Sequence, residues 1–210
     1  MNKRIYIVLL AAVLTASYAQ AQLTFGARAG LNLTNVFQED ESGNLKGLDW
    51  KPGFQIGAAA EYDLLNEEIY FQTGILFSQQ GMKTEGSLLG SKVKLMWNLN
   101  YIQIPINLVG KVDLGSTTFF LQAGPYLGYG IGGKLTAEAG GESTSEKIKF
   151  GSGDDADFRA FDLGLGAGAG FQFGNLQTGL GLNYGLVNLG KDVKVKNIGL
   201  VFTLTYMFGN

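Results

Sequence analysis

Three charged residues lie on chain segments where neighbouring side chains of the same face are small or uncharged. They are Arg28, Glu61 and Asp162. A charge that leaves water is costly unless it is paired, so each of the three is expected to have a partner inside the fold. Such a cluster can be a structural plug of ion pairs and amide hydrogen bonds, which is the favoured interpretation. It can also be a gate whose conductance depends on the pairing.

Two other motifs suggest ligand chemistry. Segment 166–170 alternates glycine and alanine like a nucleotide-binding loop, but that motif needs a following helix, and segment 171–173 continues a strand pattern instead. Asp154, Asp155 and Asp157 could supply oxygen ligands to calcium. The EF-hand spacing is missing, so a solvated acidic loop is favoured.

Histidine and cysteine are both absent from the 210 residues. Histidine is the commonest general base and metal ligand, and a nucleophilic serine needs an adjacent base. We therefore predict a non-enzymatic protein with no catalytic, cofactor-binding or metal-binding residues. With 16 basic and 18 acidic residues, the chain also lacks the basic field that nucleic acid requires.

The start of the chain is typical of an export signal. Lys3 and Arg4 precede an apolar stretch at 5–16, and residues 19–21 read Ala-Gln-Ala, a small-x-small cleavage site. The apolar stretch is shorter than the ~20 residues of a spanning helix. We predict a cleaved signal peptide at 1–21 and one domain at 22–210.

Eight segments of that domain place apolar side chains at every second position, which is the period of a strand. They span 23–34, 54–63, 69–78, 102–108, 120–129, 161–173, 176–186 and 198–208. One face of each segment is bulky and has no charge in mid-strand, and the other is rich in Gly, Thr, Asn and Gln. Pro105 would remove a ladder hydrogen bond, which predicts a bulge or local kink there.

The connections alternate between long and short. Long polar loops are expected at 35–51, 81–96 and 132–157, and tight turns at 66–68, 112–115 and 174–175. This alternation is typical of outer membrane barrels, whose periplasmic turns are short. The sequence thus predicts an all-β fold: an eight-stranded antiparallel up-and-down transmembrane β-barrel in the size class of OmpA and OmpX. A soluble lipocalin-like barrel alternates too, but it would bury its apolar face.

Aromatic residues gather near the predicted strand ends. They are Phe25, Tyr62, Phe77, Trp97, Tyr101, Phe119, Tyr129, Phe158 and Tyr206. Amphipathic rings are stabilised at the membrane–water interface, so this set is expected to form the two aromatic girdles of the barrel.

Several strands resemble those of a known family. Segments 101–106 (Tyr-Ile-Gln-Ile-Pro-Ile), 123–129 and 183–189, and Phe161-Asp162-Leu163-Gly164, are similar to strand signatures of Bacteroidota-type outer membrane β-barrel proteins. These are often labelled porin-family or PorT-family proteins with an outer membrane protein beta-barrel domain. The resemblance implies an eight-stranded barrel in a Gram-negative outer membrane. Members of the PorT branch are associated with protein secretion.

The leading functional hypothesis is a small non-enzymatic outer membrane barrel with a side-chain-packed lumen, which acts in membrane structure or through its outer loops. A narrow gated diffusion pore is the alternative, and a soluble periplasmic lipocalin-like lipid carrier is a second one. Expected partners are outer membrane lipid, the barrel-insertion machinery through the last strand ending at Phe208, and a protein at loops 35–51, 81–96 and 132–157.

Overall fold

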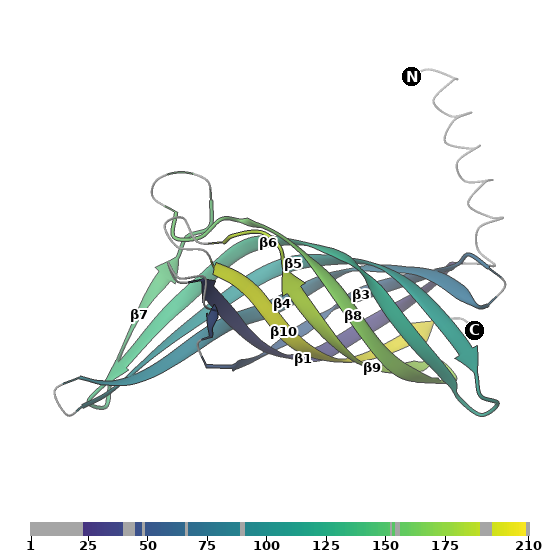
Figure 1. Cartoon of the computed structure of the whole chain (residues 1–210), viewed down its shortest axis with the longest axis horizontal. Helices are drawn as coiled ribbons and strands as arrows, with labels where there is room; N and C mark the ends of the chain where they lie inside the picture. The colour runs from purple at the N-terminus through teal and green to yellow at the C-terminus, as the bar shows by residue number, and fades with distance from the viewer. Residues whose placement is uncertain are drawn as a thin grey trace, which may run out of the picture.

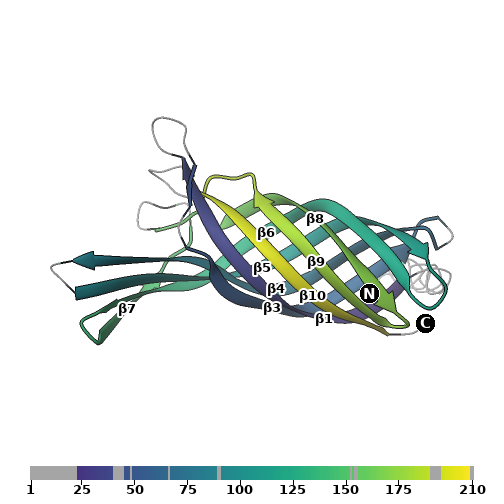
Figure 2. The same cartoon turned by 60° about the horizontal axis from the view of Figure 1, so that its bottom comes forward.

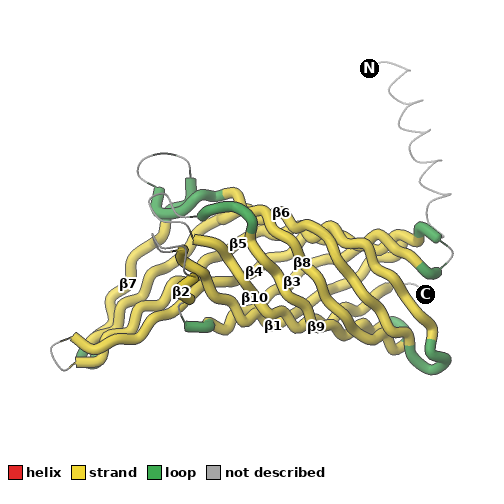
Figure 3. Tube along the Cα trace, in the orientation of Figure 1, coloured by secondary structure: helices red, strands yellow, loops and turns green. Residues whose placement is uncertain are grey.

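The computed structural model describes residues 23–39, 45–47, 49–65, 67–88, 91–151, 153, 156–189 and 195–208. The predicted signal peptide at 1–21 lies outside these residues. Every regular element in the described part of the chain is a strand (Figure 3). The strands are β1 Leu23–Glu39, β2 Leu45–Gly47, β3 Lys51–Asp63, β4 Ile69–Leu88, β5 Ser91–Asp113, β6 Thr118–Ala139, β7 Glu142–Ile148, β8 Phe161–Phe173, β9 Leu176–Gly185 and β10 Val195–Phe208.

The strands form one antiparallel sheet that closes in a ring (Figure 1). Neighbours follow the order β1–β3–β4–β5–β6–β8–β9–β10, and β10 pairs back onto β1 from Phe25↔Phe208 to Gln38↔Val195. Strand β2 pairs with the end of β1, and β7 pairs with β6. Closure gives both edges of each ring strand a partner, which a sheet in lipid requires. The all-β prediction is confirmed.

The two faces of the ring follow the alternation of the sequence. Large apolar side chains point outward, and Leu31 and Ile75 keep 65% and 63% of their surface exposed. Polar side chains such as Asn32, Gln72 and Gln103 point inward and are buried. This arrangement is the reverse of a lipocalin-like carrier, which would keep its apolar face inside.

Three ring strands continue beyond the ring. Residues 82–88 of β4, 91–99 of β5 and 133–139 of β6 run on with β7 as a four-stranded sheet, which we call the arm (Figure 2). The predicted loops 81–96 and 132–157 are therefore wrong over most of their length. Their polar residues alternate with apolar ones such as Leu95 and Leu135 in paired strands.

The register of β5 and β6 changes once, between Asn100 and Tyr101. Tyr101 opposes Gly130 and Asn100 opposes Gly132, so Ile131 is an extra residue on β6. Such a bulge reverses which β6 positions face inward. The register shows no bulge at Pro105: the pairing of β5 with β6 keeps one register from Asp113 past Pro105 to Tyr101. A local kink there stays a prediction. The carbonyl of Pro105 accepts a hydrogen bond from the Thr73 hydroxyl at 2.7 Å.

Candidate functional site

A charged network lies inside the ring near the end with the tight turns. The Arg28 Nη2 donates to Gln72 Oε1 at 2.5 Å, and Gln72 Nε2 donates to Glu61 Oε2 at 2.8 Å. The Lys111 ammonium donates to the other oxygen of Glu61. Side chains from four strands thus place two cations near one carboxylate: Lys111 contacts Glu61 directly, and Arg28 is linked to it through the Gln72 amide. We call these residues and their neighbours the turn-side cluster.

Further polar groups complete the turn-side cluster. Gln177 Nε2 donates to Glu61 Oε2 at 3.2 Å, and the Thr205 hydroxyl accepts from Arg28 Nε at 2.8 Å. The Lys111 ammonium also lies 3.9 Å from the centroid of the Tyr70 ring, a cation–π contact. The charged groups of the cluster are therefore satisfied by side chains from six strands, which ties opposite walls of the ring together.

A second polar group, the outer cluster, lies inside the ring near the end where the arm begins. Asp162 Oδ2 accepts from the Tyr126 hydroxyl at 3.3 Å and from Asn197 Nδ2 at 3.1 Å. Asp162 is 1% exposed, and the buried Tyr101 belongs to an apolar group with Leu99 at this end. The outer cluster therefore covers the interior with hydrogen-bonded and apolar side chains together.

Two small spaces lie between the two clusters. A cavity of about 50 Å³ is lined by Arg28, Gln103 and Tyr126 among others. A second, of about 10 Å³, is lined by Asn32, Tyr126 and Asn197 among others. One water needs roughly 10–15 Å³, so the larger cavity has room for a few water molecules.

The predicted charge cluster is two clusters. Arg28 and Glu61 are brought together through Gln72, whereas Asp162 has its own partners in the outer cluster. Sequence reasoning missed Lys111, the direct ion-pair partner of Glu61. The inward position of Lys111 can be predicted from the sequence. Extending the alternation of residues 102–108 to residue 111 places this lysine on the inward face with Gln103.

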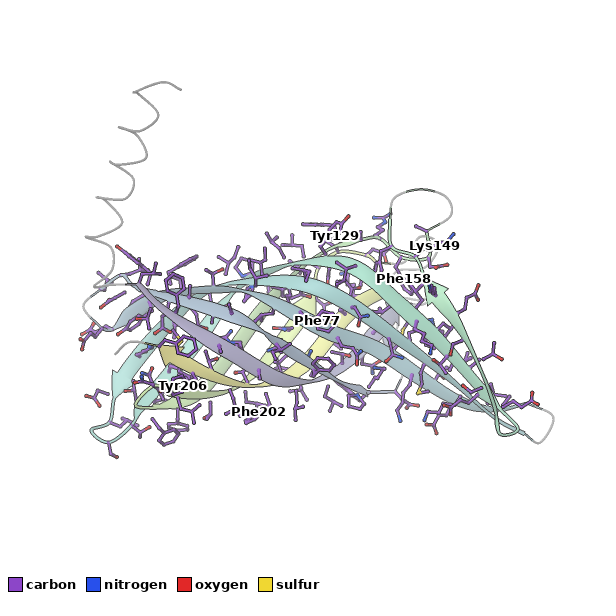
Figure 4. The ribbon with its side chains drawn as sticks, turned by 180° about the vertical axis from the view of Figure 1, so that it is seen from behind. Phe77, Tyr129, Lys149, Phe158, Phe202 and Tyr206 are labelled. Atoms are coloured by element: carbon purple, nitrogen blue, oxygen red, sulfur yellow. The ribbon has the colours of Figure 1, made fainter. Side chains whose placement is uncertain are left out.

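The predicted aromatic girdles divide between two surfaces. Outward positions are held by Phe25, Tyr62, Phe77, Phe119, Tyr129 and Tyr206. Figure 4 shows Tyr206 toward the turn end, Tyr129 toward the arm end and Phe77 between them. For these residues the girdle role stays a prediction.

Three of the predicted girdle residues lie on the inner side instead. Tyr101 is 1% exposed and packs its edge against Phe150, with ring centroids 5.4 Å apart. Trp97 and Phe158 pack against the same interior group. The reason for the two β5 residues is that this strand keeps its alternation through the bulge, so odd positions from 93 to 111 all face inward.

The arm has two different faces. Its inner face continues the ring interior and carries Leu95, Trp97 and Leu135. Trp97 and Leu135 are directly opposed on neighbouring strands, so their side chains lie on the same face. Its outward face carries Lys83, Glu85, Lys94, Glu138, Lys134 and Lys147. The outward surface therefore changes from apolar on the ring to charged on the arm.

The other sequence motifs carry no ligand site in the described residues. Segment 166–170 lies within β8 and pairs on both edges, which a phosphate-binding loop could not do. Asp157 accepts from the Lys149 backbone N–H at 2.8 Å, and Asp154 and Asp155 lie outside the described residues. No described group of acidic residues is placed to hold a metal ion. Where the structure is described, no helix is long and apolar enough to cross a membrane.

Comparison with known proteins agrees with this architecture. A family model described as outer membrane protein beta-barrel domain matches residues 18–190. The chain belongs to this family, and its place is the outer membrane. No curated protein sequence matches it.

Solved structures with a similar fold share little sequence with the chain. The attachment invasion locus protein Ail of Yersinia pestis is 16% identical, with 89% of this chain and 99% of that chain covered and a TM-score of 0.46. Neisserial surface protein A is 14% identical, with 87% and 96% covered and a TM-score of 0.43.

Proposed function

We propose that the protein is a non-enzymatic outer membrane barrel of eight strands whose lumen is closed by its own side chains. The ring strands β1, β3, β4, β5, β6, β8, β9 and β10 would span the membrane. The arm would project outside the cell, because the start of β1 at Leu23, the end of β10 at Phe208 and the tight turns all lie at the other end. In this proposal the barrel anchors the arm, and the arm makes the external contacts.

The observation that carries the proposal is the filling of the ring interior at two levels. The turn-side cluster and the outer cluster each join side chains from several walls, and the spaces between them are about 50 and 10 Å³. An eight-stranded barrel is just wide enough for side chains to fill. The same polar network supports a narrow gated pore as the alternative, since ion pairs can rearrange.

Single-channel recording in planar bilayers separates the two functions. A closed lumen predicts no conductance steps for the wild type, and none for Gln72→Ala, in which the link between Arg28 and Glu61 is cut. Recording Lys83→Ala on the arm provides a matched control for effects of side-chain truncation. Resolved steps in the wild type that change in Gln72→Ala, and not in Lys83→Ala, would favour the pore.

A further inference from the structure

The outward charges of the arm are arranged in rows across its strands. Directly opposed residues of antiparallel strands lie side by side on one face. In one row, Glu85 opposes Lys94, and Lys94 opposes Glu138. This lysine has a carboxylate on each side. In the adjacent row Lys83 forms an ion pair with Glu85 at 3.6 Å. These two rows, farther from the ring, are balanced in charge.

The row nearest the ring is not balanced. Asn98 opposes Lys134, and Lys134 opposes Lys147. Both lysines are exposed, and neither has an ion pair among the described residues. Like charges directly opposite each other destabilise a strand pair. An anion held between the two ammonium groups would remove that repulsion.

The height of this row indicates which anion is available. On β6 the outward apolar surface ends with Tyr129 and Ile131, which are 59% and 52% exposed. Lys134 lies about 10 Å further along the strand at ~3.3 Å per residue. A strand tilt of about 40° makes this about 8 Å along the membrane normal. The headgroup layer extends roughly 5–8 Å beyond the hydrocarbon on each side, so the lysines reach the level of lipid phosphates.

Access to the row is open from the side. Strand β7 pairs with β6 alone among the described strands, so the edge next to Lys147 is not covered by another strand. A lipid beside the ring could place its headgroup there while its chains lie along the apolar outward face of β6. A phosphate carries more than one acceptor oxygen, which suits two ammonium donors and the Asn98 amide together.

We propose that Lys134 and Lys147 bind the phosphate of a lipid headgroup in the outer leaflet, with Asn98 as a neutral third donor. This inference rests on the proposed function, because it requires the ring to span the membrane with the arm outside. It adds a ligand class to the arm: phosphorylated lipid rather than a protein. Bound lipid would fix the base of the arm against the membrane surface.

The test uses the full chain in zwitterionic detergent micelles doped with bis-phosphorylated lipid A or with the dephosphorylated lipid. Native mass spectrometry measures the bound fraction. At about fivefold per surface lysine, Lys134→Gln and Lys147→Gln should each lower affinity about fivefold and the double variant roughly 30-fold. The control, Lys83→Gln with Lys94→Gln, removes the same charge from balanced rows and should change affinity less than about twofold.

Three results with the two lipids would overturn the inference. They are wild-type affinity in the Lys134→Gln/Lys147→Gln variant, equal loss in the control variant, and equal binding of the dephosphorylated lipid. Free inorganic phosphate is tested as a competitor of lipid A. Competition at equal concentration would show a phosphate site without selectivity for lipid, which also contradicts the proposal. Conductance steps in bilayers would contradict the closed lumen without affecting these lipid-binding results, so the two failures are distinguishable.

Discussion

The ring and the arm are built from the same strands in different surroundings. Along β4 the outward face shows Ile75 and Phe77 within the ring, then Lys83 and Glu85 on the arm. The pairing of β4 with β5 keeps one register over the whole length, from Ile69↔Gly110 to Leu88↔Ser91. Strand pairing is therefore common to both regions. The outward side chains differ with the expected surroundings: they are apolar where lipid is expected and charged where water is expected.

The ion pairs of the two regions differ in the same way. The side chains of Lys111 and Glu61 inside the ring are 7% and 5% exposed, whereas those of Lys83 and Glu85 on the arm are 32% and 55% exposed. Buried charges depend on each other for solvation, whereas exposed ones have water. The charges inside the ring therefore depend on one another for solvation, whereas the arm charges are open to solvent.

The largest expected effect comes from breaking the buried pair. Glu61→Ala leaves Lys111 and Arg28 buried without a carboxylate and should lower the free energy of unfolding by about 3–5 kcal/mol. Glu85→Ala removes the exposed partner of Lys83 and should cost about 0–1 kcal/mol. Urea unfolding in lipid vesicles measures both. Equal losses in the two variants would end the distinction between the ring interior and the arm.

A charge on the outward face is the next test. Ile75→Arg places a cation on the expected lipid surface of β4 and should cost about 2–4 kcal/mol. Met96→Arg makes the same change on the outward face of the arm, where the expected change is within about 0.5 kcal/mol. The same vesicle unfolding experiment applies. A loss at Met96 as large as the loss at Ile75 would place the arm in lipid as well.

The space around individual glycines differs between the ring and the arm. A Cβ added at Gly124 would lie 1.9 Å from the Ile106 carbonyl oxygen, whereas one at Gly86 would meet no atom within 4 Å. We expect Gly124→Ala to cost about 1–3 kcal/mol, as overpacking does. Gly86→Ala on the arm should be neutral within about 0.5 kcal/mol. Thermal melts in micelles would show it, and a tolerated Gly124→Ala would mean that the ring interior has spare room.

The smallest expected effect has the opposite sign. Lys134→Glu replaces a like-charged pair with an opposite-charged pair across β6 and β7, so it should stabilise the arm by about 0.2–1 kcal/mol without added anion. Amide hydrogen exchange in β7 measures the local change. Lys94→Glu is the matched control. There the new carboxylate faces Glu85 and Glu138, so amide exchange in β5 should become faster. Faster exchange in Lys134→Glu would contradict the repulsion between Lys134 and Lys147.

Much of the ring could be predicted from the sequence because a strand has a strict period of two. Once Leu31 and Ile75 are placed outside, Arg28 and Gln72 must lie inside, and the buried face follows residue by residue. Glu61 and Arg28 could thus be assigned to the interior, but their link through Gln72 could not. Which inward residues meet depends on the stagger of neighbouring strands, which the alternation does not encode.

The arm could not be predicted from the sequence because its composition is as polar as that of a loop. Polar residues in 81–96 and 132–157 suggested solvent exposure, which is correct, and lack of strand, which is wrong. A sheet in water needs only one apolar face, and Leu95, Trp97 and Leu135 supply it. The extra residue Ile131 hides this pattern further, because it reverses the inward parity of β6 midway. The inward placement of Trp97 and Tyr101 has a related reason. Nearness to a strand end predicts height in the membrane, but the odd positions of β5 face inward at every height.

The most direct test of the account measures where the outward face of β4 leaves the lipid. The chain has no cysteine, so single cysteines at positions 71, 73, 75, 77, 83 and 85 can carry spin labels without background. Accessibility to oxygen, which concentrates in lipid, is compared with accessibility to a water-soluble nickel chelate. The account predicts oxygen-dominated labels from Phe71 to Phe77 and nickel-dominated labels at Lys83 and Glu85. A uniform response along the strand, of either kind, would contradict it.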